Sequence, residues 1–342
     1  MPDVVALGDV NVDIVAHFAS YPAKGQDALA DATEFHCGGS AANTAIALAR
    51  MGLDVCLIAR VGSDPLAPKA LDNLREAGVA PSGLQRDPAV ATGLMYIIVT
   101  PDGERTILGH RGANVFTDPN QIREQDIQDA KLFHLSGYAL LADPQRSAAL
   151  LSLEMACRHG LTVTLDPGMS ISQKVLDGAR ALLPRVDIVM PNLTEAQRLT
   201  GQTQPKECAQ ALLEAGAEVV ALKLGGDGCL IGDGKGLRYV PGFAVETRDT
   251  TGAGDTFSAG VIAGFLGGLD WCSAAILGNA MGAVAAAHVG GGTMIPWVQE
   301  VLKLLSDHRQ RGSHGECGDA FQQVMNFVGA LAKRLEEEGE TR

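Results

Sequence analysis

Cysteine pairs with the spacing Cys-x-x-Cys are absent from this sequence, although it holds seven cysteines in 342 residues. The seven lie singly along the chain, and their scatter and odd number argue against a disulfide framework and against a zinc site. None of the eight histidines stands in a His-Glu-x-x-His or similar ligand spacing. The composition is typical of a reducing compartment, and we expect the cytoplasm.

Positive charge is also scarce. The 27 Lys and Arg residues face 40 Asp and Glu residues, which gives a formal net charge of −13. This balance argues against a nucleic acid or an anionic membrane surface as the main ligand. It does not exclude a ligand that carries phosphate, because a nest of backbone N–H groups binds phosphate without any net positive charge.

Long uninterrupted apolar runs are missing as well. The first residues, Met1–Asp9, contain no basic residue, so we expect no signal peptide. The run Ser258–Val289 is rich in small residues, but polar side chains and glycines interrupt it. We therefore interpret it as buried core helices and expect no membrane partner.

Short apolar runs alternate with helical patterns in the middle of the chain. The predicted strands are Leu132–Leu135, Leu161–Leu165, Val186–Met190 and Val219–Leu224, and the predicted helices are Arg146–Arg158, Ser172–Leu183 and Lys206–Ala215. Such alternation is typical of βαβ units and predicts an α/β protein with a mostly parallel sheet covered on both faces.

The flanking regions add elements of both kinds. We expect strands at Val4–Leu7 and Val55–Val61, helices at Ala41–Met51, Lys69–Ala77, Ala253–Leu266 and Trp271–His288, and a hairpin of Leu94–Thr100 with Glu104–Leu108. From Ser306 the chain becomes polar and predicts a linker, followed by an amphipathic helix over Phe321–Leu335. We expect this helix to pack on the body of the protein or on a partner subunit.

The run Asp249-Thr-Thr-Gly-Ala-Gly-Asp255-Thr-Phe257 carries the clearest chemical pattern. Its glycines allow a close approach of the backbone to a ligand, and a helix that begins here would offer free N–H groups to an anion. A carboxylate in that first turn can accept a proton from a hydroxyl, as phosphoryl transfer requires. Taken alone, the same run fits an ordinary tight turn before a helix about equally well.

A second glycine run, Gly38-Gly-Ser-Ala-Ala-Asn-Thr-Ala45, lies about two hundred residues earlier and is followed by Gly52 and Gly62. Together the two runs resemble the paired signatures of the PfkB carbohydrate-kinase family, and the resemblance covers roughly residues 3–304. It implies a ribokinase-like three-layer α/β/α sandwich with a mostly parallel central sheet and a small β-sheet lid. It also implies ATP-dependent phosphorylation of a sugar hydroxyl with Mg2+.

The resemblance assigns roles to individual residues. It implies that Asp255 is the catalytic base and that the backbone N–H groups of Gly252, Ala253 and Gly254 form the anion hole. The sugar would be held by Asn11, Asp13, Gly38, Gly39 and Asn43, with Arg105 as a further candidate for an acidic substrate. The ATP-binding candidates are Asn192, Lys223, Gly225, Gly228 and Asn279. Glu195 would hold Mg2+ through water, and Asp249 and Thr251, with the stretch 286–291, would form a potassium site.

The implied domain organisation divides the chain into three parts. Residues 1–11, 36–91 and 110–305 would form the core, residues 12–35 and 92–109 the lid, and residues 306–342 a linker with the C-terminal helix. The lid would close over the sugar and form a homodimer interface.

The residues do not decide which molecule accepts the phosphoryl group. Ser40 stands where ribokinases typically carry lysine, which puts ribose in doubt, and Arg105 and Arg111 are either ligands of an acidic sugar or solvated surface charges. A nucleoside kinase of the same fold is the alternative enzyme, and a non-catalytic sugar- or nucleotide-binding relative is the alternative from another class. The intact Gly-Ala-Gly-Asp favours the enzyme, because a binding protein has no need of the base.

Overall fold

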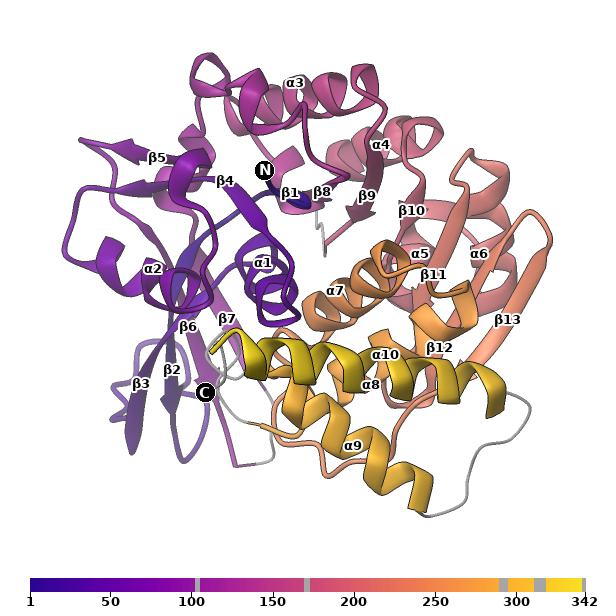
Figure 1. Ribbon diagram of the computed structural model, residues 1–342. Coiled ribbons are helices and arrows are strands. Elements are labelled where there is room, and N and C mark those ends of the chain that lie inside the picture. Colours follow the sequence, from indigo (N-terminus) through magenta and orange to yellow (C-terminus); the bar gives the residue numbers. More distant parts are fainter. Residues whose placement is uncertain (102–104, 169–172, 289–294, 311–317, 340–342) are drawn as a thin grey trace.

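The computed structural model describes residues 1–101, 105–168, 173–288, 295–310 and 318–339. In this part of the chain nine strands form the main sheet, in the order β13-β12-β11-β10-β9-β8-β1-β4-β5 (Figure 1). The strands are β1 Val4–Leu7, β4 Val55–Gly62, β5 Leu84–Asp87, β8 Leu132–Ser136, β9 Thr162–Asp166, β10 Ile188–Val189, β11 Val219–Lys223, β12 Gly228–Asp233 and β13 Gly236–Pro241. Neighbouring strands pair in parallel, except that β12 runs antiparallel to both β11 and β13. The prediction of a mostly parallel sheet is confirmed.

Helices cover both faces of this sheet. Along β1, Val4 and Ala6 enter one hydrophobic core and Val5 and Leu7 the other, as expected for a strand buried on both sides. The first core is closed by α1 Ser40–Arg50, α2 Leu66–Glu76, α7 Ala253–Leu266, α8 Trp271–Ala286, α9 Val298–Gln310 and α10 Gly318–Glu337. The second is closed by α3 Gln145–Arg158, α4 Gln173–Leu182, α5 Leu193–Thr200 and α6 Pro205–Glu214. This three-layer arrangement is the α/β/α sandwich that the sequence predicts.

The order of the strands reverses at β1, with β4 and β5 on one side and β8 to β11 on the other. In open parallel sheets ligands bind outside the carboxyl ends of the strands at such a reversal. Gly8, directly after β1, packs so closely there that a Cβ on it would lie 2.6 Å from Ala41 Cβ and 2.9 Å from Ser136 Cβ. The start of α1 therefore sits at the point where the fold is expected to bind its ligand.

A smaller, four-stranded sheet stands beside the main body in the order β3-β2-β6-β7 (Figure 1). Its strands are β2 Asn11–His17, β3 Ala32–Gly38, β6 Gly93–Val99 and β7 Arg105–His110. The pairs β2–β3 and β6–β7 are antiparallel, and β2–β6 is parallel. The two segments that interrupt the alternating pattern in the sequence thus join in one sheet.

The C-terminal part differs from the expectation at one point. Helix α9 continues through Gln310, so Asp307–Gln310 are helical and not part of a linker. Helix α10 includes the predicted amphipathic stretch, and its apolar side chains are buried in the first core with α8 and α9. Figure 1 shows α10 lying across the front of this helical layer. Within the described residues, no helix is both long and apolar enough to cross a bilayer.

Candidate active site

Helix α7 begins at the carboxyl edge of the sheet without a side-chain cap. Its N-cap residue Gly252 has a left-handed backbone (φ 77°) and makes no side-chain cap, and the N–H of Ala253 donates to the carbonyl of Thr250 over 3.2 Å. Helix α1, which packs beside α7, also begins at a glycine without a side-chain cap, whereas Asn192 caps α5 and Asp270 caps α8. An uncapped N-terminus at a ligand-binding edge is suited to an anion.

Asp255 lies in this first turn and is held by the start of α1. Ser40 Oγ donates to Oδ1 over 2.7 Å, and Asn43 Nδ2 donates to Oδ2 over 2.8 Å. Burial and the nearby carboxylate of Asp166 raise the pKa of Asp255 to about 6, although these two hydrogen bonds and Lys223 oppose the rise. The carboxylate is therefore ionised at neutral pH and sits close to the range in which a base accepts a proton efficiently.

Behind Asp255 lies a buried ion pair that joins two strands of the main sheet. Lys223, at the end of β11, donates from Nζ to Oδ2 of Asp166, at the end of β9, over 2.7 Å. Ser258 Oγ donates to the same oxygen over 2.9 Å. Lys223 is not a solvated surface charge, since its side chain is 12% exposed.

On the side of the smaller sheet, two buried acceptors face no partner. Among the described residues, nothing forms a hydrogen bond with Asp13 Oδ1 or Asn43 Oδ1. Gly38 leaves the room for Asp13, because a Cβ there would lie 2.2 Å from its Oδ2. Burial, together with the charges of Asp255 and Asp249, raises the pKa of Asp13 to about 7. Buried polar atoms are normally satisfied, so this pair of oxygens indicates a ligand that donates hydrogen bonds.

Asn11 is oriented by a residue that the sequence reasoning did not single out. Asn114 Nδ2 donates to Asn11 Oδ1 over 2.8 Å and to the carbonyl of Val10 over 3.0 Å, while Asn114 Oδ1 accepts from Val10 N–H over 2.9 Å. With its oxygen engaged, Asn11 presents its N–H groups as donors.

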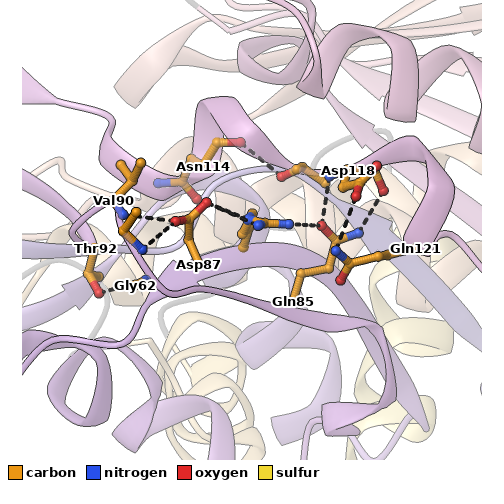
Figure 2. A network of polar contacts seen from close by, with 11 residues as sticks. Gly62, Gln85, Asp87, Val90, Thr92, Asn114, Asp118 and Gln121 are labelled. Carbon is orange, nitrogen blue, oxygen red and sulfur yellow. Dashed lines mark hydrogen bonds and ion pairs between the residues drawn. The ribbon is translucent and has the colours of Figure 1, made fainter.

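Asn114 itself stands at one end of a buried polar network (Figure 2). Its carbonyl accepts from Thr117 Oγ1, and Asp118, one residue further, exchanges hydrogen bonds with Gln85. Arg60 then links Gln85 to Asp87. The network fixes the segments that lead into and out of the smaller sheet.

The two arginines considered as ligands of an acidic substrate differ. Arg111 forms a two-pronged ion pair with Asp9, from Nε to Oδ2 and from Nη2 to Oδ1, each over 2.8 Å. Gln145 donates to the same Asp9 carboxylate over 2.7 Å. Arg111 is therefore not a solvated surface charge. Its guanidinium group is already paired with the carboxylate of Asp9. Arg105 begins β7, and its side chain lies outside the described part of the structure.

The residues expected to contact ATP line the carboxyl edge beyond β9. Asn192 and Glu195 form a reciprocal capping box at the start of α5, with both hydrogen bonds 2.9 Å long. Burial, reinforced by Asp166, raises the pKa of Glu195 to about 7. Gly225, in the turn after β11, and Gly228, the first residue of β12, both have positive φ. Nothing lies within 4 Å of a Cβ placed on Gly225, whereas a Cβ on Gly228 would lie 2.2 Å from the carbonyl oxygen of Val240. Gly225 therefore offers bare backbone to a ligand, and Gly228 packs against β13.

Asn279 performs a supporting task. Its Nδ2 donates to the carbonyls of Val240 and Pro241, each over 3.1 Å. Because Pro241 pairs with Gly228 across the sheet, Asn279 holds the strand behind the glycine loop.

For the potassium site, Asp249 Oδ1 accepts from the N–H of Thr251 over 2.8 Å, and the N–H of Asp249 donates to the carbonyl of Ala286. Residues 289–291 of the expected stretch lie outside the described residues. Among the residues that the structure places, no group of three or more His, Cys, Asp or Glu side chains is arranged to hold a metal ion.

A family comparison shows which family the chain belongs to. The profile described as "pfkB family carbohydrate kinase" matches residues 1–298. The protein is a pfkB-family carbohydrate kinase. The resemblance inferred from the two glycine runs is confirmed, and with it the assignment to an enzyme class.

Two curated relatives of this carbohydrate kinase are named as kinases of small sugars. An ATP-dependent ribose-1-phosphate kinase from Halopiger xanaduensis is 33% identical over 307 residues, covering 90% of this chain and 99% of the relative. A ribokinase from Haemophilus influenzae is 28% identical, covering 88% and 98%. Among solved structures, an E. coli protein described as a ribokinase II in complex with ATP and Mg2+ matches with a TM-score of 0.82 at 24% identity, covering 90% of this chain and 100% of that one. This last likeness shows the ribokinase fold.

Proposed function

We propose that this kinase transfers the γ-phosphoryl group of ATP to a sugar hydroxyl, with Asp255 as the base. The main support is a pair of buried acceptors beside that carboxylate, Asp13 Oδ1 and Asn43 Oδ1, which have no hydrogen-bond partner among the described residues. A polyol supplies adjacent hydroxyls that donate to both oxygens, and the N–H groups of Asn11 meet a hydroxyl oxygen. The remaining hydroxyl then faces Asp255.

The reaction follows from this placement. Asp255 accepts the proton of the attacking hydroxyl as its oxygen bonds to phosphorus, and the bond from phosphorus to the ADP oxygen breaks. The first turn of α7, from Gly252 through Gly254, stabilises the charge on the transferring group through its N–H groups and the helix dipole. Gly38 and Gly39 would lie against the sugar at the start of α1, where their missing Cβ atoms leave room for the Asp13 carboxylate and the Asp9 carbonyl.

ATP fits the edge between α7 and the loop after β11. Gly225 supplies bare backbone for the nucleotide, and Gly228, packed against β13, shapes the turn behind it. Asn192 and Lys223 are the candidates for phosphate contacts, and Asn279 supports the loop from behind. The buried carboxylate of Glu195 is suited to hold Mg2+ through water. When bound, Mg2+ neutralises charge on the β- and γ-phosphates. We extend the proposal to K+ bound by Asp249 and the Thr251 carbonyl, where the oxygen donors suit an alkali cation.

We also propose that the smaller sheet acts as a lid and as a homodimer interface in the cytoplasm. Phe35, Ile14, Tyr96 and Leu108 are paired side by side across its four strands. Phe35, Tyr96 and Leu108 are each about half exposed. Such a row of apolar side chains is a surface that a second copy can cover. Closure of the lid would exclude water from the phosphoryl group.

An ADP-release assay over a panel of acceptors tests the function. We expect turnover with at least one sugar among ribose, 2-deoxyribose, fructose and ribose 1-phosphate, each with and without K+. Turnover only with adenosine or inosine would replace the sugar by a nucleoside. Tight ATP binding without turnover on any member would contradict the enzyme.

A further inference from the structure

The ammonium group of Lys223 lies directly beneath the anion hole. A Cβ placed on Gly254 would lie 3.6 Å from Lys223 Nζ, so the charge touches the first turn of α7. The lysine reaches this position from β11, across β10, to its ion pair with Asp166 on β9. A full positive charge therefore stands next to the uncapped N–H groups that face the phosphoryl group.

The surroundings keep this lysine charged. Burial by itself lowers its pKa, but the carboxylates of Asp166, Glu195 and Asp255 outweigh burial and raise the pKa above the ordinary value. One ammonium thus faces three carboxylates from β9, α5 and α7. Lys223 can therefore exchange one carboxylate for a more highly charged anion, such as a phosphate group, and stay protonated.

Ser258 would keep Asp166 hydrogen-bonded if Lys223 moved to another anion. It lies one turn after Gly254 on the same face of α7, and it donates to the same oxygen, Oδ2, that Lys223 contacts. When the lysine moves away, Asp166 keeps a hydrogen bond.

We propose that Lys223 is a catalytic residue that passes from Asp166 to the γ-phosphoryl group, with Asp166 and Ser258 as its positioning residues. This inference rests on the proposed phosphoryl transfer. The lysine keeps its three protons throughout: the acceptor proton goes to Asp255, and Lys223 stabilises charge on the phosphoryl oxygens as the bond to ADP breaks.

The first test compares nucleotide binding and turnover in Lys223→Met. We expect wild-type protein with Mg2+ to bind a non-hydrolysable ATP analogue more tightly than ADP in calorimetry, and Lys223→Met to lose that preference by about tenfold. In turnover we expect kcat to fall by roughly 10²–10³-fold while the KM for the sugar changes little. Lys235→Met, on the exposed turn between β12 and β13, is the matched control and should behave as wild type.

The double variant Lys223→Met/Asp166→Asn separates catalysis from folding. Removing the lysine alone leaves a buried uncompensated carboxylate, which destabilises a protein, whereas replacing both partners is close to neutral. We expect the double variant to recover the thermal stability of the wild type and to stay as slow as Lys223→Met.

The acidic limb of the kcat/KM profile gives a second readout for the positioning role. The charged groups around Asp255 are Asp166 from β9, Lys223 from β11, Glu195 from α5 and Asp13 from β2, with Ser40 and Asn43 donating from α1. Asp166→Asn should move the limb to lower pH, and Lys223→Met should move it to higher pH. Opposed shifts show that both charges act on the base in the working enzyme, and an unmoved limb in both variants contradicts their placement beside Asp255.

Three results overturn the inference: a wild type that binds the analogue and ADP equally, a Lys223→Met variant that keeps the preference, or a double variant that regains wild-type kcat. Failure of the proposed function is a different result. If no acceptor is phosphorylated, the nucleotide preference still decides whether Lys223 contacts the γ-phosphate.

Discussion

The side chains of Ser40 and Asp255 stand 215 residues apart in the chain, and Ser40 Oγ donates a 2.7 Å hydrogen bond to Asp255 Oδ1. Asn43, one turn further along α1, holds the second oxygen of the same carboxylate. The two glycine runs of the sequence thus meet at one functional group. The donors fix the orientation of the base and still leave lone pairs on both oxygens for a proton.

The first prediction concerns the base itself. Asp255→Asn keeps the shape of the side chain but cannot accept the proton, so we expect kcat to fall by about 10²–10⁴-fold. Calorimetric affinities for ATP and sugar should stay near wild type, because the lost interaction belongs to the transition state. A variant that kept a tenth of wild-type turnover would show that Asp255 is not the base.

The second prediction concerns pH. Since the pKa of Asp255 is raised to about 6, kcat/KM should rise with pH through this value and level off above it, where the carboxylate is ionised. The hydrogen bond from Ser40 favours the ionised form, so Ser40→Ala should shift the acidic limb to higher pH and leave the plateau nearly unchanged. The exposed Ser63→Ala serves as the control. An unmoved limb would rule out this role of Ser40.

The third prediction links sugar binding to stability. The pKa of Asp13 is raised to about 7, so the folded protein binds a proton there that the unfolded chain has released between pH 4 and 7. Stability from this group is therefore lost as pH rises toward and past 7. Asp13→Asn should raise the melting temperature by several degrees at pH 8 and by less at pH 5, while sugar affinity falls roughly tenfold. The exposed Asp31→Asn should change neither; an Asp13→Asn variant that melts lower at pH 8 would refute the burial argument.

The fourth prediction concerns α10. Val328 is fully buried against the first core, whereas Ala330 on the same helix is exposed. Val328→Asp places an unpaired charge in that core and should cost about 4 kcal/mol of the free energy of unfolding. Ala330→Asp should stay within about 0.5 kcal/mol in the same urea titration. Equal effects would mean that α10 is not an integral part of the fold.

The parallel core could be predicted because strands buried on both faces leave continuous apolar runs, and α7 was predicted with its observed bounds. Other elements carried weaker patterns. Helix α5 spans only Leu193–Thr200, which is too short for a clear helical pattern. The β12–β13 hairpin lies in a glycine-rich stretch around Gly234, where the strand pattern is weak. The last turn of α9 consists of polar residues, which in the sequence resemble a linker, although the ring of His308 packs against Phe243 and Phe321.

For the site, the residues near the two glycine runs were found because their spacing is local. The Asp166–Lys223 pair was not, since 57 residues separate its members and only the order of β9, β10 and β11 brings them together. A signal existed nonetheless: Asp166 follows a predicted apolar strand directly, at the edge where ligands bind. Asn114 gave no comparable signal, because its role depends on the path of the chain out of the smaller sheet.

Helix α10 lies beyond the residues that the family profile matches, yet its apolar face completes the core over α8 and α9. A chain emerges from the ribosome with its N-terminus first, so α10 is made after all the residues that the profile matches. The helical layer beside the nucleotide edge therefore cannot close until α10 has emerged. Until then the nascent chain exposes the apolar surface that α10 covers, and in that interval it most needs protection from aggregation.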